Sequence, residues 1–251
     1  MNTYTPAQNA PNNFANNTLA TRFVNAYNLL DHSLRTQYNF KTNISFSDLI
    51  RRCASLNQVI RLYEDDLIDL ARLRNAIIHS RSEEVIAEPH ENVVEILEKV
   101  ARIISTPPLV VNAIKATTVD TISAESKLRD YIIMSSTIGH GNIPVYKRDM
   151  LIGVLQRHSF LEELGHVLST GASLDNFIAE TNIETFLREH PTTVHFTIVS
   201  SRATIEEVIE LFGNRKLTAV IITDNGTSSG KLMGIVTGAD IMGLLKILEG
   251  Y

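Results

Sequence analysis

The second half of the chain repeats one order of apolar segments, and this repeat limits the folds that it can adopt. In each copy an apolar segment is followed by a helical stretch and then by two short apolar runs separated by a turn. The segments of the first copy are Ile122, a helix from Leu128, and the runs 143–146 and 151–155. Those of the second copy are Val199, a helix from Ile205, and the runs 218–222 and 232–236. Because short apolar runs that alternate with helices indicate strands, the sequence predicts a tandem β-α-β-β-α duplication.

The first half has a different period, with apolar residues three and four positions apart between Thr18 and Ile104. This spacing predicts amphipathic helices, which we expect at 19–34, at 46–63, from Glu64 onward, and at 93–104. Ser45, with Asp48 three residues later, has the form of a capping box, and Pro107-Pro108 ends the last helix. We therefore expect an α+β chain, in which an antiparallel four-helix bundle precedes the duplicated half.

These patterns divide the 251 residues into segments of different character. The expected segments are an Asn-rich flexible tail at 1–17, the helical bundle at 18–106, and the duplicated half at 107–251. Within the duplicated half we expect the first copy at 107–170, a helical connector at 171–192, and the second copy at 193–251.

The composition places limits on localisation and on partners. With 44% hydrophobic and 20% charged residues, and with no apolar run long enough to cross a bilayer, we expect no membrane association. The N-terminal segment lacks the features of a signal peptide, and the single Cys53 fits a reducing compartment, so we expect a cytoplasmic protein. The net charge of −5 means that any contact with RNA must come from a local basic patch.

The second copy ends in Gly234-Ile235-Val236-Thr237-Gly238-Ala239-Asp240, and with this signature the duplicated half resembles a pair of CBS motifs, the Bateman module. The resemblance implies that Thr237 and Asp240 hold the ribose of a regulatory adenine nucleotide: AMP, ADP, ATP or a cyclic adenylate. A helix start also has free amides that favour such a ligand. Four further candidates lie before and within the run at 218–222: Arg215, Lys216, Thr218 and Ala219.

Two alternatives stay open for these residues. Thr237 and Asp240 are also the residue types that cap a helix without any ligand, and Arg215 and Lys216 are also typical solvated loop cations. The first copy departs from the signature, since Gln156 replaces the hydroxyl and Ser159 replaces the carboxylate. We therefore expect one nucleotide site in each chain.

A second candidate site is the string Arg74-Asn75-Ala76-Ile77-Ile78-His79, late in the third expected helix. Arginine can hold a phosphate, and histidine can exchange a proton near neutral pH. In a short helical bundle this string resembles the HEPN domain, whose members with the intact motif are typically metal-independent endoribonucleases that work as dimers. The resemblance implies that Arg74 stabilises the scissile phosphate, Asn75 orients it, and His79 moves the proton.

On an ideal helix Arg74 and His79 are about 140° apart, so one helix does not close this site. A homodimer, paired through both the helical bundle and the CBS pair, would bring two such helices together. We expect no metal site, because the other histidines show no ligand spacing, and no cofactor is required for cleavage. The alternative is that Arg74 and Asn75 only satisfy a helix end or a carboxylate such as Asp69, and that His79 is an ordinary cation of the last helical turn.

The sequence thus predicts a metal-independent HEPN-type endoribonuclease that cuts single-stranded RNA in stress or defence, under control of an adenine nucleotide. The alternative is a non-catalytic, nucleotide-sensing adaptor whose helical bundle binds a partner protein. The RNA preference and the identity of the nucleotide do not follow from the sequence.

Overall fold

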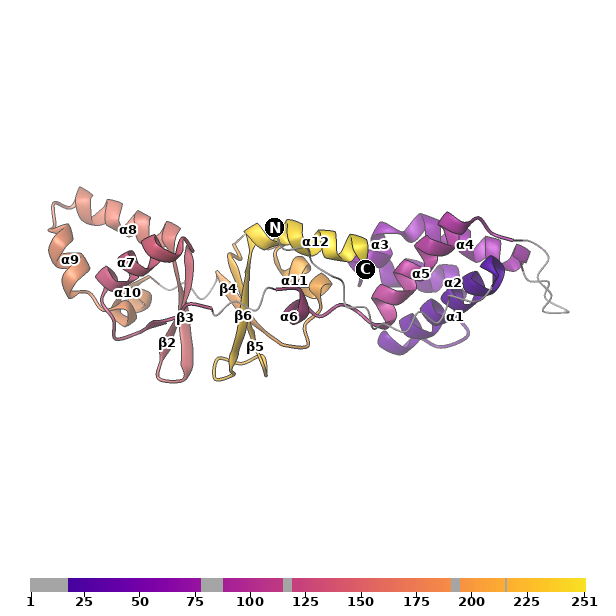
Figure 1. Ribbon diagram of the computed structural model, residues 1–251, viewed down its shortest axis with the longest axis horizontal. Helices are drawn as coiled ribbons and strands as arrows, with labels where there is room; N and C mark the ends of the chain where they lie inside the picture. Colours follow the sequence, from indigo (N-terminus) through magenta and orange to yellow (C-terminus); the bar gives the residue numbers. More distant parts are fainter. Residues whose placement is uncertain (1–17, 78–87, 115–118, 191–194, 215) are drawn as a thin grey trace. The chain divides into compact units, whose positions relative to one another are not determined.

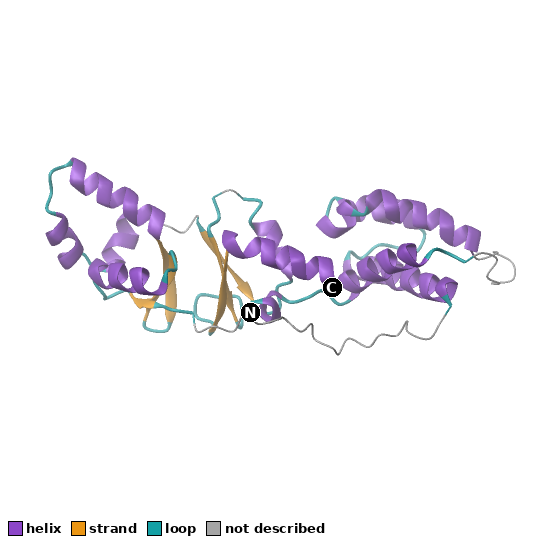
Figure 2. Cartoon of the chain, turned by 45° about the horizontal axis from the view of Figure 1, so that its top comes forward, coloured by secondary structure: helices purple, strands orange, loops and turns teal. Residues whose placement is uncertain are grey.

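The computed structural model describes residues 18–77, 88–114, 119–190, 195–214 and 216–251. The chain divides into two compact units, Met1–Pro107 together with Tyr251, and Pro108–Gly250. The first unit is helical, and the second contains two three-stranded sheets (Figures 1 and 2). The mixture of helix and sheet predicted from the sequence is thus confirmed. None of the described helices combines the length and the hydropathy that crossing a bilayer would need.

The described part of the first unit contains five helical segments rather than the four expected. They are α1 (Leu19–Gln37), α2 (Phe46–Ala54), α3 (Gln58–Leu62), α4 (Glu64–Ile77) and α5 (Glu91–Ser105). The prediction of one helix at 46–63 is wrong, because the chain breaks between α2 and α3. There Asn57 begins a new helix, with its side-chain oxygen accepting from the Ile60 amide at 2.8 Å. An Asn cap of this kind satisfies a free helix amide and so restarts the helix.

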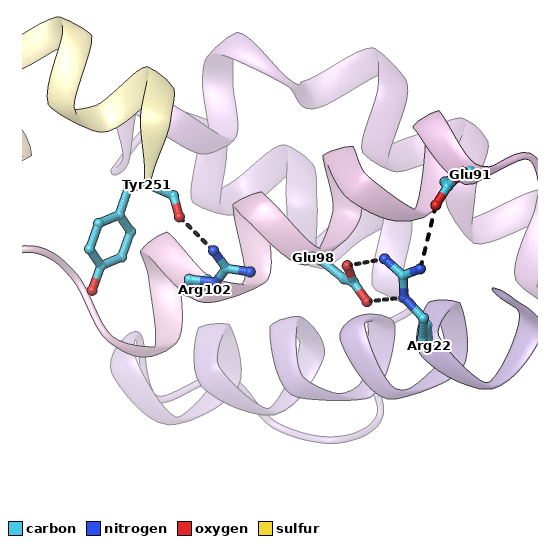
Figure 3. A network of polar contacts seen from close by, with 5 residues as sticks. All are labelled: Arg22, Glu91, Glu98, Arg102 and Tyr251. Atoms are coloured by element: carbon cyan, nitrogen blue, oxygen red, sulfur yellow. Dashed lines mark hydrogen bonds and ion pairs between the residues drawn. The ribbon is translucent and has the colours of Figure 1, made fainter. Parts of the chain in front are cut away.

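An ion pair in the helical unit joins α1 to α5 beside the apolar core (Figure 3). The Arg22 guanidinium donates to both carboxylate oxygens of Glu98, at 2.9 and 2.8 Å, and Glu98 is buried. Near the other end of α5, Arg102 donates to the backbone oxygen of Tyr251 at 2.7 Å. The apolar core of this unit includes Phe23, Leu30 and Leu97.

The second unit carries the order β-α-β-β-α twice. After α6 (Val110–Ala113), the first set is β1 (Ile122–Ser123), α7 (Leu128–Ile138), β2 (Asn142–Lys147), β3 (Met150–Gln156) and α8 (Arg157–Ser169). The expected connector holds two helices, α9 (Leu174–Glu180) and α10 (Ile183–Glu189). The second set is β4 (Phe196–Ser200), α11 (Ile205–Leu211), β5 (Ala219–Thr223), β6 (Leu232–Thr237) and α12 (Ile241–Gly250). In each sheet the first strand runs parallel to the second, and the third runs antiparallel to it.

Strand β5 shows how the sequence positions the sheets. Val220 and Ile222 pack in the core on the helix side of the second sheet. Ile221, between them, packs with Leu151 and Val154 of β3 in a separate cluster. Because successive side chains of a strand point to opposite faces, a strand buried on both faces reads as an unbroken apolar run. The sheets therefore meet through one face each, and their helices cover the other.

The contact between the two sheets includes a main-chain hydrogen bond. The Leu151 amide of β3 donates to the backbone oxygen of Ser228, in the turn between β5 and β6, at 2.8 Å. The face of the second sheet that carries Ile221 is thus directed toward the first copy, and side chains at the end of this face lie beside β3.

Candidate functional site

Three strand ends meet at one edge of the second sheet. Phe196 of β4 is opposite Ala219 of β5, and Ala219 is opposite Thr237 of β6. Alternation along the strands puts all three on the same face as Ile221, the face directed toward the first copy. We call this row, Phe196, Ala219 and Thr237, the 219 edge. It lies where β6 ends and the next helix begins.

Thr237 and Asp240 form a reciprocal cap at that helix start. Thr237 precedes a 3₁₀ turn, Gly238–Asp240, which continues into α12. Both the amide and the hydroxyl of Thr237 donate to Oδ2 of Asp240, each at 2.8 Å. The capping role left open by the sequence is therefore present. Asp240 is exposed, and within the described part of the chain its Oδ1 accepts no hydrogen bond, so one carboxylate oxygen is left for a ligand.

Thr218, just before β5, forms hydrogen bonds with two residues, His195 and Gln156. Its hydroxyl donates to the backbone oxygen of His195 at 2.8 Å, and its amide donates to the same oxygen at 2.7 Å. The same hydroxyl accepts from Nε2 of Gln156, across the two copies, at 2.7 Å. Thr218 therefore holds the starts of β4 and β5 together. Its hydroxyl is already used by the protein.

Of the two candidate cations, Lys216 and Arg215, the structure describes only Lys216. Lys216 is exposed, and its backbone oxygen lies 3.2 Å from Nδ1 of His195, so this loop lies against the residue that precedes β4. Its side chain stays a candidate contact for a phosphate. Arg215 lies outside the described residues.

In the first copy the same position is organised differently. Gln156 is opposite Asn142, as Thr237 is opposite Ala219, and it is buried with 4% exposure. Arg157 follows it, and its guanidinium donates to the backbone oxygen of Gly139 at 3.1 Å, at the C-terminal end of α7. A cation placed there offsets the free carbonyl groups of the helix. Gln156, which differs from the signature, and Arg157 after it thus make structural contacts within the protein.

The second copy also contains a cavity of about 620 Å³, away from the 219 edge. Its lining residues are Val199, Ser200, Arg202, Ala203, Glu207, Glu210 and Leu211. Since Val199 and Ser200 are at the opposite end of β4 from Phe196, this cavity and the 219 edge are separate features.

The candidate catalytic residues are only partly placed. Arg74 lies in the last turn of α4 and is half-buried, with its guanidinium carbon 6.0 Å from the centroid of the Tyr27 ring. Its Nε is buried and has no hydrogen-bond partner among the described residues. Asn75 is exposed, and His79 lies outside the described residues. The alternative pairing of Arg74 with Asp69 is not seen, because Asp69 pairs with Arg72 at 2.8 Å.

The ring beside Arg74 has an altered acidity. The pKa of Tyr27 is raised to about 12, mainly by burial and further by the carboxylate of Asp31, whereas Arg74 and Arg35 act in the opposite direction. Tyr27 is thus a neutral side chain beside the Arg74 cation, a geometry in which the ring face attracts the charge. In the described ranges, no group of three potential metal ligands occurs.

The sequence interpretation treated Gln156 only as a departure from the signature, and it missed the role of His195. No local pattern predicts a contact between residues 62 positions apart. The strand register of the structure makes the role of Gln156 visible, because the end of β3 matches the end of β6 and Gln156 lies where Thr237 lies in the second copy.

Comparison with protein families gave a match in the second copy. Residues 187–247 match the model of the CBS domain. Comparison with curated proteins gave no match.

Three of the similar solved structures contain CBS domains. The first is a putative signal-transduction protein with CBS domains from Burkholderia ambifaria MC40-6, with 18% identity, TM-score 0.42, and coverage of 56% of this chain and 91% of that one. The second is the CBS domain of the bacterial CNNM/CorC family Mg²⁺ transporter in complex with ATP, with 15% identity, TM-score 0.44, and coverage of 60% and 94%. The third is the CBS domain of a membrane protein from Sphaerobacter thermophilus, with 14% identity, TM-score 0.42, and coverage of 55% and 87%. The match to the CBS domain model at residues 187–247 includes β4, α11, β5 and β6, and therefore contains the 219 edge.

Proposed function

We propose that this protein is a nucleotide-responsive regulator, and that its CBS domain binds an adenine nucleotide at the 219 edge. The observation that carries the proposal is the meeting of Ala219, Thr237 and Asp240 at an exposed helix start. Asp240 has one carboxylate oxygen that no described residue uses, and a carboxylate can accept hydrogen bonds from both hydroxyls of a ribose. The free amides of the helix start and the nearby Lys216 favour phosphate.

Isothermal titration of the full chain with AMP, ADP, ATP and cyclic adenylates tests this proposal. Asp240→Asn removes the charge but keeps an oxygen that can accept from the Thr237 amide, so it should weaken binding at least about tenfold with little loss of stability. Glu210→Gln is the matched control, because Glu210 is an exposed carboxylate that lines the separate cavity. Equal affinity in wild type and Asp240→Asn would contradict the site.

For the helical unit we propose a metal-independent endoribonuclease that acts as a homodimer on single-stranded RNA. Support comes from Arg74, which is in the last turn of α4 with a buried, unpartnered Nε and no carboxylate partner among the described residues. A cation not neutralised by the protein is available for a phosphate. In this proposal Asn75 orients the phosphate and His79 transfers the proton.

Incubation of wild type with mixed single-stranded RNA in EDTA, with and without each adenine nucleotide, tests the activity and its control. Arg74→Ala and His79→Ala should each abolish cleavage. Arg72→Ala is the control on the same helix, because Arg72 is exposed and paired with Asp69. Cleavage that survives in Arg74→Ala would refute the assignment, and nucleotide binding without any cleavage would favour the adaptor.

The two proposals are linked by the ligand. A nucleotide can change the activity of the helical unit only if it binds more tightly to one pairing of the two chains than to another. We therefore expect nucleotide addition to change the cleavage rate of wild type and to leave that of Asp240→Asn unchanged.

A further inference from the structure

We infer that Gln156 of the first copy is a positioning residue for the nucleotide site of the second copy, an inference that rests on the nucleotide binding proposed above. Gln156 occupies the position that corresponds to Thr237, but its side chain does not form a second ligand site. It donates from Nε2 to the hydroxyl of Thr218, at 2.7 Å. The first copy thereby supplies a contact to the 219 edge.

The burial of Gln156 makes this contact significant. Only 4% of the residue is exposed, and a buried carboxamide is costly unless it is hydrogen-bonded. Its one hydrogen bond to another described side chain is the bond to Thr218. The bond therefore selects one orientation of the Gln156 side chain and one of the Thr218 hydroxyl.

The orientation of Thr218 in turn sets the strand ends. With its lone pair engaged by Gln156, the hydroxyl donates to the backbone oxygen of His195, at 2.8 Å. His195 directly precedes β4 and Thr218 directly precedes β5, so this bond holds the first residues of the two strands, Phe196 and Ala219, in register. Ala219 is in turn paired with Thr237. A nucleotide that binds at Thr237 and Asp240 therefore contacts strand ends whose positions are already fixed by the hydrogen bond from Gln156 to Thr218.

The same residue connects the site to the helices of the first copy. Gln156 is the residue immediately before α8, and the Arg157 amide that follows donates to the backbone oxygen of Gly141 at 2.8 Å. Arg157 also donates from its side chain to Gly139, at the end of α7. Hydrogen bonds of Gln156 and of the next residue, Arg157, thus connect Thr218, beside the 219 edge, to the starts of α8 and β2. Pre-ordering of a site raises affinity because less order must be created on binding.

A double-mutant cycle on the full chain tests the inference, with ATP, ADP and AMP as the titrated probes. Gln156→Ala and Thr218→Val should each weaken nucleotide binding about tenfold, the effect of leaving one buried partner unsatisfied. Gln156→Ala and Thr218→Val remove the same hydrogen bond. The nucleotide affinity of the double variant should therefore be no lower than that of the single variant with the lower affinity. Thr218→Ser keeps the hydroxyl and should bind like wild type, whereas a merely spatial role of the threonine methyl group would weaken it too.

The outcomes separate this inference from the proposed function. If Asp240→Asn loses binding while Gln156→Ala and Thr218→Val stay within twofold of wild type, the positioning role is refuted and the nucleotide site stands. If wild type binds neither these three nucleotides nor the cyclic adenylates, both are refuted. If Gln156→Ala fails to fold, the comparison of Thr218→Val with wild type decides, since valine has the shape of threonine but lacks the hydroxyl that Gln156 and His195 bind.

Discussion

The ion pair between Arg22 and Glu98 should contribute strongly to the stability of the helical unit. Arg22→Met keeps the aliphatic stem of the side chain but removes two charge-assisted hydrogen bonds to a carboxylate whose side chain is only 8% exposed. Removing one partner of a fully buried pair costs about 3–5 kcal/mol. Because the Arg22 side chain is 21% exposed, solvent screens part of this interaction, and we expect a loss of about 2–3 kcal/mol.

Hydrogen exchange resolved by peptide is the suitable assay, because it reports on each unit of the chain separately. In Arg22→Met, amides of α1 and α5 should exchange about 30- to 150-fold faster than in wild type, the factor that corresponds to this free energy. Peptides of β5, in the other unit, serve as an internal reference. Arg51→Met is the matched control, since Arg51 and its partner Asp48 are 54% and 57% exposed, so that solvent screens their interaction and its loss should change the exchange rates little.

A second variant separates the cost of an unpaired charge from the value of the pair. Replacing both partners, Arg22→Met with Glu98→Leu, leaves no buried carboxylate and should restore the stability to within about 1 kcal/mol of wild type. If the single variant exchanges no faster than Arg51→Met, the pair does not stabilise α1 against α5 and the reasoning is refuted.

Three further outcomes are expected. Burial raises the pKa of the Cys53 thiol to about 11, so alkylation at pH 8 should be slow in the native protein and fast in urea; equal rates would contradict its burial. Because the pKa of Tyr27 is raised to about 12, its phenol stays protonated as the pH rises past 10, and Tyr27→Phe should leave the absorbance titration at 295 nm unchanged below about pH 11. Gly226→Ala should destabilise the protein by more than about 1 kcal/mol in urea unfolding, because φ is +77° and the new methyl would lie 3.1 Å from the Ser200 amide nitrogen. Gly243→Ala, in α12 with no neighbour within 4 Å, should be neutral or stabilising, and a similar loss in both variants would refute the strain argument.

The strands show which part of the fold can be predicted from the local pattern of apolar residues. The expected run at 218–222 became β5 at Ala219–Thr223, because all five residues of β5 are buried, with Val220 and Ile222 in the helix-side core and Ile221 against the other sheet. Such a run has few alternatives to a central strand. By contrast, the expected helix at 46–63 is two helices, since the apolar spacing continues unchanged across the cap at Asn57. Hydrophobic periodicity reports which face is buried, but it does not detect a local break in the backbone.

By itself the sequence determined the alternation of strands and helices and the duplication, and it marked Thr237 and Asp240 as a helix cap or a ligand pair, because these patterns depend on residues a few positions apart. It also marked Arg74 and Asn75 as a possible site in a helix, although their catalytic role stays a prediction. Only the tertiary structure decided what Gln156 does, because its partner Thr218 is 62 positions away. Which side chains meet over that distance depends on strand register, on the face each residue occupies and on the packing of the two sheets. None of these is encoded in a short segment of the chain.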